Sequence, residues 1–457
     1  MSEEKIEASE GDSNAISRRG FITSAAATGG ALAVGGLVPT KLLNGLQKSR
    51  VVKKAPTLGE QLRSILGEPK HLLAKGPGVF NTTALFPLSG TGAGQGKLMV
   101  RGHKLGLQHV KAWTNGKLDL RTTKYYDNQS GVPAACVAAA RNNGIDKNPF
   151  MIMSYSFGFG SVPPIAKEFN FLCMDPGGGT APIFGGLPYC YGTRASWPLD
   201  PQEGLAKTIQ ALHPTAKRWV VVSADVAAPW NSACQTYMTK LYAKLGINLV
   251  GFINAPVGQT DYSTTISAVK ALNPDVTVFM TFGDDVPYQA IAVQNQNLTG
   301  IFAGAEYLTT STAIAGPKNA YNNWYFGFDF LNVVQPPNDW TKLFIKDYTK
   351  THQGIPGIYE AGYYVNIFNH AILMDDILRQ GGNIKEGKAY IKALNTFPTF
   401  PHVYGGNGKT LGKIQMNPNT HSLSKIPMVA FQVKGSRYQD IAILATYDEN
   451  PTTWKLT

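Results

Sequence analysis

From residue 79 onward, the spacing of apolar residues alternates between the period of a strand and the period of a helix. Residues 118–126 place Leu118, Leu120 and Thr122 on alternate positions, and the alanine-rich segment 133–143 that follows is typical of a helix. The same alternation restarts at residue 218 with the apolar run RWVVVS. Strands separated by helices of about 10–15 residues indicate βαβ units. The sequence therefore predicts an α/β fold with parallel sheets in two successive lobes.

The predicted elements form three groups. The first has strands at 79–85, 118–126, 150–154 and 171–174 with helices at 94–110, 133–143 and 161–170. The second has strands at 218–223, 248–254, 276–281 and 301–304 with helices at 232–245, 262–272 and 289–295. The third has a strand at 324–330, helices at 339–352, 359–380 and 385–395, and strands within 413–433. Residues 188–201 are rich in turn residues, which is typical of a crossover between lobes.

Composition excludes several classes of protein. With 43% hydrophobic and 16% charged residues, the chain has the balance of a folded protein. Its net charge of +12 is scattered rather than gathered into a stripe, so we expect no nucleic-acid partner. The four cysteines show no C-x-x-C spacing, so we expect no zinc or iron–sulfur site. Cys173 and Cys190 leave two alternatives open, a disulfide or buried free thiols.

The N-terminus carries the features of an export signal. Arg18 and Arg19 precede Phe21-Ile22 and the small, weakly apolar stretch 25–36. This order is typical of the twin-arginine motif, although a tail with a chance arginine pair is the alternative. Ala31-Leu32-Ala33 suits cleavage, which predicts a signal peptide at 1–33, a basic leader at 34–78 with a short helical pattern at 58–66, and a periplasmic protein that the twin-arginine translocase exports. The signal is too short and glycine-rich for a permanent anchor, and no later run approaches about 18 apolar residues.

The chain lacks the residue sets of common enzymes. There is no G-x-S-x-G sequence, no H-x-x-x-H pair, and the glycines of 92–96 depart from the G-x-G-x-x-G order. We therefore expect no catalysis, no cofactor and no metal. Glycines and hydroxyls instead dominate 87–96, 154–161, 175–180 and 304–309, which follow predicted strands. Such loops let backbone N–H groups approach a small anion such as a carboxylate.

The order of several short motifs resembles a known family. Pro87-Leu88-Ser89-Gly90 is followed by Asp127-Asn128-Gln129-Ser130, Asp175-Pro176, residues 188–194 and Thr260-Asp261-Tyr262-Ser263. From about residue 79 to 435, this order is similar to the branched-chain amino-acid type of periplasmic solute receptors of ABC importers. The resemblance implies two Rossmann-like lobes, joined by a multi-strand hinge, that close on a solute and present it to a membrane permease with its ATPase.

The resemblance also implies site residues. Donors to a ligand carboxylate would be Ser156, Phe157, Gly178, Gly179 and Thr180, and Glu306 would hold an α-ammonium group. Trp230 and Tyr363 would be aromatic contacts, although a core role is equally open for each. Gln95 and Asp284 stand where the family commonly has aromatic residues, which makes the expected cleft more polar.

The resemblance assigns the lobes and the function. Lobe 1 is expected at 79–192 plus 325–397, lobe 2 at 193–324 plus 398–448, and a tail at 449–457. The expected function is capture and delivery of an amino-acid-like solute. Two alternatives are a receptor for aromatic or aliphatic carboxylates or amides, and a ligand sensor of the same fold.

Overall fold

In the computed structural model, the described part of the chain between Pro56 and Thr457 is built on three β-sheets. The described residues are 55–457, apart from 154–160, 178–185, 188, 194–198, 200, 226–229, 282–284, 305–319, 330, 353, 397, 425–426, 436–440 and 448–452. The predicted signal with Arg18 and Arg19 lies outside them. Among the helices of the described part, none has the length and apolar character needed to cross a membrane.

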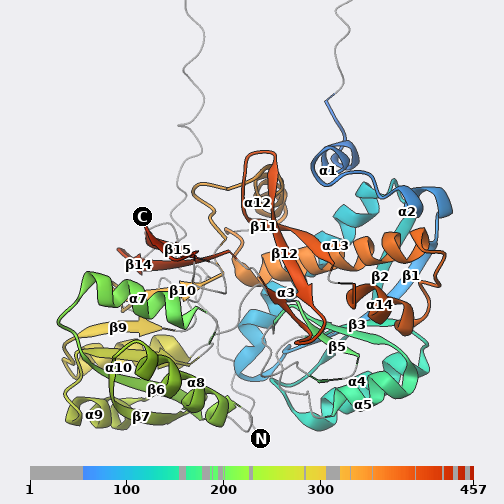
Figure 1. Cartoon of the computed structure of the whole chain (residues 1–457). Coiled ribbons are helices and arrows are strands. Elements are labelled where there is room, and N and C mark those ends of the chain that lie inside the picture. Colours follow the sequence, from blue (N-terminus) through green and yellow to red (C-terminus); the bar gives the residue numbers. More distant parts are fainter. Residues whose placement is uncertain are drawn as a thin grey trace, which may run out of the picture. The chain divides into compact units, whose positions relative to one another are not determined.

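The first lobe is built on a parallel sheet with the strand order β2-β1-β3-β4-β5. Its strands are β1 (Gly78–Phe86), β2 (Leu118–Asp127), β3 (Phe150–Met153), β4 (Leu172–Asp175) and β5 (Cys190–Gly192). Figure 1 labels β1, β2, β3 and β5 of this sheet. Every residue of β3 and β4 is buried, as expected for strands covered on both faces. The first predicted series is therefore confirmed.

Helices cover this sheet, and two of them approach each other closely. The helices are α3 (Ala93–Trp113), α4 (Pro133–Ile145), α5 (Val162–Phe169), α13 (Ile358–Arg379) and α14 (Gly387–Leu394). Gly102 and Gly106 on α3 face the backbone of Glu360 and Tyr364 on α13. A Cβ atom at Gly102 would lie 2.1 Å from the Glu360 carbonyl oxygen, so only glycine permits this approach.

The second lobe is built on an eight-stranded mixed sheet with the order β16-β15-β14-β10-β9-β8-β6-β7. The parallel part is β6 (Arg218–Asp225), β7 (Asn248–Pro256), β8 (Val276–Met280), β9 (Ile301–Gly304) and β10 (Tyr325–Phe328), and the antiparallel part is β14 (Met428–Val433), β15 (Ile441–Tyr447) and β16 (Lys455–Leu456). The helices that follow these strands or precede them are α7 (Gln202–Leu212), α8 (Trp230–Lys244), α9 (Ser263–Ala271) and α10 (Asp285–Asn295). The second predicted series is confirmed, and α7 is an addition to it.

The structure corrects three parts of the expected lobe boundaries. β10 was expected in lobe 1, but it pairs with β9 and β14 in the second sheet. Residues from 398 were expected to continue lobe 2. Instead, β11 (Thr399–Asn407), β12 (Thr410–Asn417) and β13 (Ser422–Ser424) form a separate antiparallel sheet that packs on α12 (Asp339–Thr351), α13 and β5. The expected tail contains β16, which pairs with β15.

Residues 56–77 of the expected leader belong to the folded unit. They form α1 (Leu58–Leu66), as the helical pattern at 58–66 predicts, and α2 (Lys70–Lys75). A capping box between Thr57 and Glu60 begins α1. The Arg63 guanidinium donates to the Trp113 carbonyl (3.0 Å), and the Trp113 indole N–H donates to the Gly67 carbonyl (2.8 Å). These bonds attach α1 to the end of α3.

Candidate ligand-binding site

The loop after β1 is fixed by the loop after β2. One carboxylate oxygen of Asp127 accepts hydrogen bonds from the backbone N–H groups of Leu88 (2.9 Å), Ser89 (3.1 Å) and Gln129 (2.8 Å). The Ser130 hydroxyl donates to the Ser89 carbonyl (2.8 Å) and accepts from the Gly92 N–H (2.9 Å). The two motifs quoted from the sequence thus form one hydrogen-bonded unit at the carboxyl edge of the sheet.

These bonds change the acidity of Asp127. Partial burial alone would raise the pKa of its carboxyl, but hydrogen bonds from Ser89, Gln129 and Leu88 outweigh burial and lower the pKa. The resulting stabilisation is present at neutral pH and is lost as the pH falls below the ordinary value of about 4, toward the lowered one.

Replacing Asp127 with asparagine is expected to weaken this unit. Asp127→Asn keeps an acceptor but removes the charge, so we expect a loss of about 1 kcal/mol at pH 7, less than the value of a full charged hydrogen bond. Urea unfolding of the two proteins at pH 7 measures the difference. Asp146→Asn, at the end of α4, is the control. Equal stabilities of wild type and Asp127→Asn would contradict this role.

Gln95 lies in the first turn of α3, directly after this unit. Its side chain is 3% exposed, and its Oε1 atom has no hydrogen-bond partner. The next residue, Gly96, lies against Pro87, and a Cβ atom there would be 1.9 Å from the Pro87 carbonyl oxygen. The polar position expected from the sequence is therefore a buried acceptor at a helix N-terminus.

Helix α13 holds the carboxyl ends of β3 and β5. The fully buried Tyr363 directs its hydroxyl toward the Met153 carbonyl (3.5 Å) and packs edge-on against Phe86, with ring centroids 5.0 Å apart. One turn later, the Asn366 amide donates to the Thr193 hydroxyl (2.6 Å). The aromatic position expected at Tyr363 thus packs inside lobe 1, and a contact with a ligand stays a prediction.

The end of β4 is tied to the same region. The Thr193 N–H donates to the Asp175 carbonyl (2.8 Å), and the Asp175 carboxylate accepts from the Gly177 N–H (2.6 Å). Sequence reasoning missed Asn366 and Thr193 as parts of this arrangement. One sequence signal for Asn366 was available. Asn366 lies three residues after Tyr363, so in a helix both side chains lie on the same face.

In the second lobe, Trp230 and Asp285 begin helices beside the strand ends. Trp230 opens α8, is 4% exposed, and donates its indole N–H to the Ser223 hydroxyl on β6 (3.1 Å). Asp285 opens α10, and its carboxylate accepts from the Gly258 N–H after β7 (2.8 Å). Trp230 is therefore largely buried, and its contact with a solute is untested.

The other predicted site residues lie outside the described residues: Ser156, Phe157, Gly178, Gly179, Thr180, Asp284 and Glu306. The topology nevertheless constrains where their segments start. Residues 154–160 follow β3 and 178–185 follow β4, which are neighbouring parallel strands. Residues 282–284 follow β8 and 305–319 follow β9, which are also neighbours. The segments after β3 and β4 thus start from the same edge of the first sheet. The segments after β8 and β9 start from the same edge of the second sheet.

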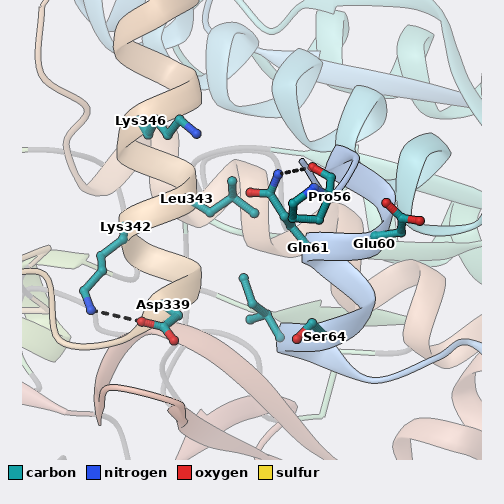
Figure 2. A pocket seen from close by; sticks show the side chains of 9 residues that line it. Pro56, Glu60, Gln61, Ser64, Asp339, Lys342, Leu343 and Lys346 are labelled. Carbon is teal, nitrogen blue, oxygen red and sulfur yellow. Dashed lines mark hydrogen bonds and ion pairs between the residues drawn. The ribbon is translucent and has the colours of Figure 1, made fainter. Parts of the chain in front are cut away.

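Two further kinds of candidate site in the described part are metal sites and pockets. No group of His, Cys, Asp and Glu among the described residues is suited to hold a metal ion. A pocket of about 410 Å³ lies between α1 and α12, lined by charged and polar side chains around Ile65 and Leu343 (Figure 2). It adjoins no carboxyl end of a strand, so we do not assign the solute site to it.

Comparison with known proteins settles the family. The model of the periplasmic binding protein family matches residues 83–437. The chain belongs to this family. No curated protein matches the chain significantly. Residues 56–77, with α1 and α2, precede the matched region of this periplasmic binding protein.

Solved structures share the fold at low sequence identity. A solute-binding protein of an ABC transporter from R. palustris, in complex with 4-hydroxybenzoate, has a TM-score of 0.67 and 15% identity, over 82% of this chain and 99% of that one. The leucine-binding protein LivK from Thermotoga maritima has a TM-score of 0.64 and 16% identity, over 80% and 98%. The leucine-, isoleucine-, valine-, threonine- and alanine-binding protein from Brucella ovis has a TM-score of 0.67 and 16% identity, over 82% and 96%. They support the two-lobed α/β fold.

Proposed function

We propose that this protein is the exported solute-binding component of an ABC importer and captures an amino-acid-like solute without catalysis. The observation that carries the proposal is the family match over residues 83–437, and hydrogen bonds that hold the strand-end loops in place support it. Closure of the two lobes on the solute, and recognition of the closed form by a permease and its ATPase, follow from this assignment.

The proposed ligand has a carboxylate and an amine. Gly178, Gly179 and Thr180 directly follow the Asp175–Gly177 turn, so their segment starts at a fixed backbone position. Backbone N–H and hydroxyl groups in that segment suit a carboxylate, and Glu306, two residues after β9, suits an ammonium. A charged hydrogen bond of this kind contributes about 1.5–3 kcal/mol, enough to favour ligands with an amine.

A second candidate ligand is an aromatic acid without an amine. Gln95 presents a buried amide oxygen that has no partner, and such an acceptor suits a phenolic hydroxyl as well as an ammonium. Proteins of the same fold have been solved with 4-hydroxybenzoate and with 3,4-dihydroxybenzoic acid. This ligand would need Gln95 rather than Glu306.

A thermal-shift screen of the full chain against amino acids and hydroxybenzoates distinguishes the two ligands. At 100 times its Kd, a ligand adds about 2.7 kcal/mol of stability. We expect amino acids to stabilise wild type and Glu168→Gln, an exposed control on α5, but not Glu306→Gln. Stabilisation by hydroxybenzoates alone, abolished in Gln95→Leu, would support the second candidate. If neither class stabilises the protein, both ligand proposals fail.

Export is tested separately from binding. Replacing Arg18 and Arg19 together with lysine is expected to leave the precursor in the cytoplasm of a bacterium with a twin-arginine translocase, because the motif is read as an arginine pair. Cell fractionation measures the location, and Lys53→Arg is the control. Normal export of the double variant would exclude the twin-arginine route. Solute uptake that depends on this protein would separate an importer from a sensor.

A further inference from the structure

Two of the four cysteines lie side by side in the first sheet. Cys173 on β4 and Cys190 on β5 are register partners in a parallel ladder, so their side chains point to the same face. Neighbouring strands lie about 4.7–4.9 Å apart, and a disulfide needs Cα atoms about 4.4–6.8 Å apart. The backbone therefore already provides the separation that a disulfide requires.

Both cysteines are free and fully buried, and they interact. Burial and the neighbouring Cys190 thiol raise the pKa of Cys173 well above its ordinary value. A raised pKa reduces the thiolate fraction, so reaction with an oxidant is slow in the closed state. Access therefore depends on local opening of the strand pair.

β5 is the element that can open. It has three residues and lies at the edge of the sheet. On its outer side, the Gly192 N–H donates to the His421 carbonyl (2.8 Å), and the Tyr191 ring stacks on the His421 ring with centroids 4.3 Å apart. Because β5 is a three-residue edge strand that pairs with β4 alone in this sheet, it opens at a lower free energy than the central strands do.

We propose that Cys173 and Cys190 are a dithiol modification site that small-molecule disulfides convert into an intrachain disulfide. One thiolate attacks the external disulfide and releases one thiol. The second thiolate then attacks the mixed disulfide, forms the Cys173–Cys190 bond and releases the second thiol. Two cysteine protons and two electrons leave the protein, and the external disulfide is reduced to two thiols.

The other two cysteines provide the comparison. Cys136 lies on α4 of the first lobe and Cys234 on α8 of the second. Both are buried, but because they lie on helices, neither stands opposite another cysteine as Cys173 and Cys190 do on neighbouring strands. The disulfide would also enclose residues 174–189, which include Gly178, Gly179 and Thr180, so it would restrict the segment proposed to bind the carboxylate.

The test counts thiols in the full chain. The native protein is incubated with oxidised glutathione, quenched with acid, unfolded, alkylated and examined by intact mass and peptide mapping. We expect wild type and Cys234→Ser to lose the Cys173 and Cys190 thiols together and to yield the crosslinked peptide pair. Cys190→Ser should instead stop at a mixed disulfide on Cys173.

Two results would overturn the proposal. One is retention of all four alkylatable thiols in wild type, even in urea just below its unfolding transition. The other is a crosslink that maps to Cys136 or Cys234. A folded Cys190→Ser is verified by circular dichroism, and Cys173→Ser replaces it if it fails to fold. The count uses no solute, so it is independent of whether the proposed transport function is correct.

Discussion

Lowering the pH from 7 to 5 is expected to destabilise the fold by several kcal/mol, because four histidines are buried in the neutral form. His103, His109, His370 and His402 are each at most 2% exposed. Burial lowers the pKa of His109 to about 4 and the pKa values of the other three to about 3. Protonating any of them would place a positive charge in a buried site, and of the four only His109 has a carboxylate within ion-pair distance among the described residues, Asp347 at 3.4 Å from its Nε2 atom.

The sign of this change in stability follows from how many protons the folded and unfolded chains bind. Between the ordinary histidine pKa of about 6.5 and the lowered values, the unfolded chain binds protons that the folded chain does not. Stability therefore falls as the pH decreases through this window. The native contacts agree, because the His402 Nδ1 atom accepts a hydrogen bond from the Tyr404 N–H (3.1 Å) and must be unprotonated to do so.

The expected loss of unfolding free energy between pH 7 and pH 5 is large. From pH 7 to pH 5, each such histidine costs about 2 kcal/mol, or about 8 kcal/mol for four. Burial raises the pKa values of Glu360 and Asp347, and these two carboxyls take up protons on folding as the pH falls. They offset part of the loss. Because domains are stable by about 5–15 kcal/mol, we expect unfolding to begin near pH 5.

Urea unfolding, followed by tryptophan fluorescence at pH 7, 6 and 5, measures how steeply the free energy of unfolding changes with pH. His370 suits the test because neither ring nitrogen has a partner and its ring packs on Phe150. His370→Leu should remove about a quarter of the histidine contribution to the loss of stability between pH 7 and 5. Asn369→Leu is the control, since Asn369 is a buried, unpartnered and non-titrating neighbour on the same helix. The same slope in His370→Leu as in wild type would contradict the prediction.

Local patterns in the sequence predicted most of the elements but not their pairing. The apolar periods that define β1 through β4 and β6 through β9 depend on each segment alone, and the structure has strands there. β10 belongs to the second sheet because it pairs with the open edge of β9. The residues of β10 itself do not indicate which sheet offers such an edge. For the same reason, the separate sheet of β11, β12 and β13 was assigned to lobe 2.

The site was predictable where motifs are local and not where they are brought together. The sequence placed the loops at 87–96 and 127–130 at strand ends, and Asp127 joins them. It did not reveal that Asn366, more than a hundred residues after Thr193, reaches the end of β5. Nor did it reveal that Cys173 and Cys190 share one register, because the register depends on where β5 joins the sheet.

Adding one methyl group at Gly102 is expected to cost about 3 kcal/mol, at the upper end of the usual overpacking range of about 1–3 kcal/mol. The new Cβ atom of Gly102→Ala would lie 2.1 Å from the carbonyl oxygen and 2.6 Å from the Cα atom of Glu360. Both are backbone atoms, so no side-chain rotation relieves the overlap. α13 would have to move, and with it Tyr363 and Asn366, which hold the ends of β3 and β5.

Gly94 on the same helix is a matched control. It is exposed, and a Cβ atom there would meet nothing within 4 Å. Because alanine has less backbone freedom to lose than glycine, Gly94→Ala should stabilise the protein by about 0.4–1 kcal/mol. Urea unfolding at pH 7 compares the two variants with wild type. Opposite signs would show that close helix packing, rather than helix propensity, requires glycine at position 102, whereas similar effects of the two substitutions would refute that explanation.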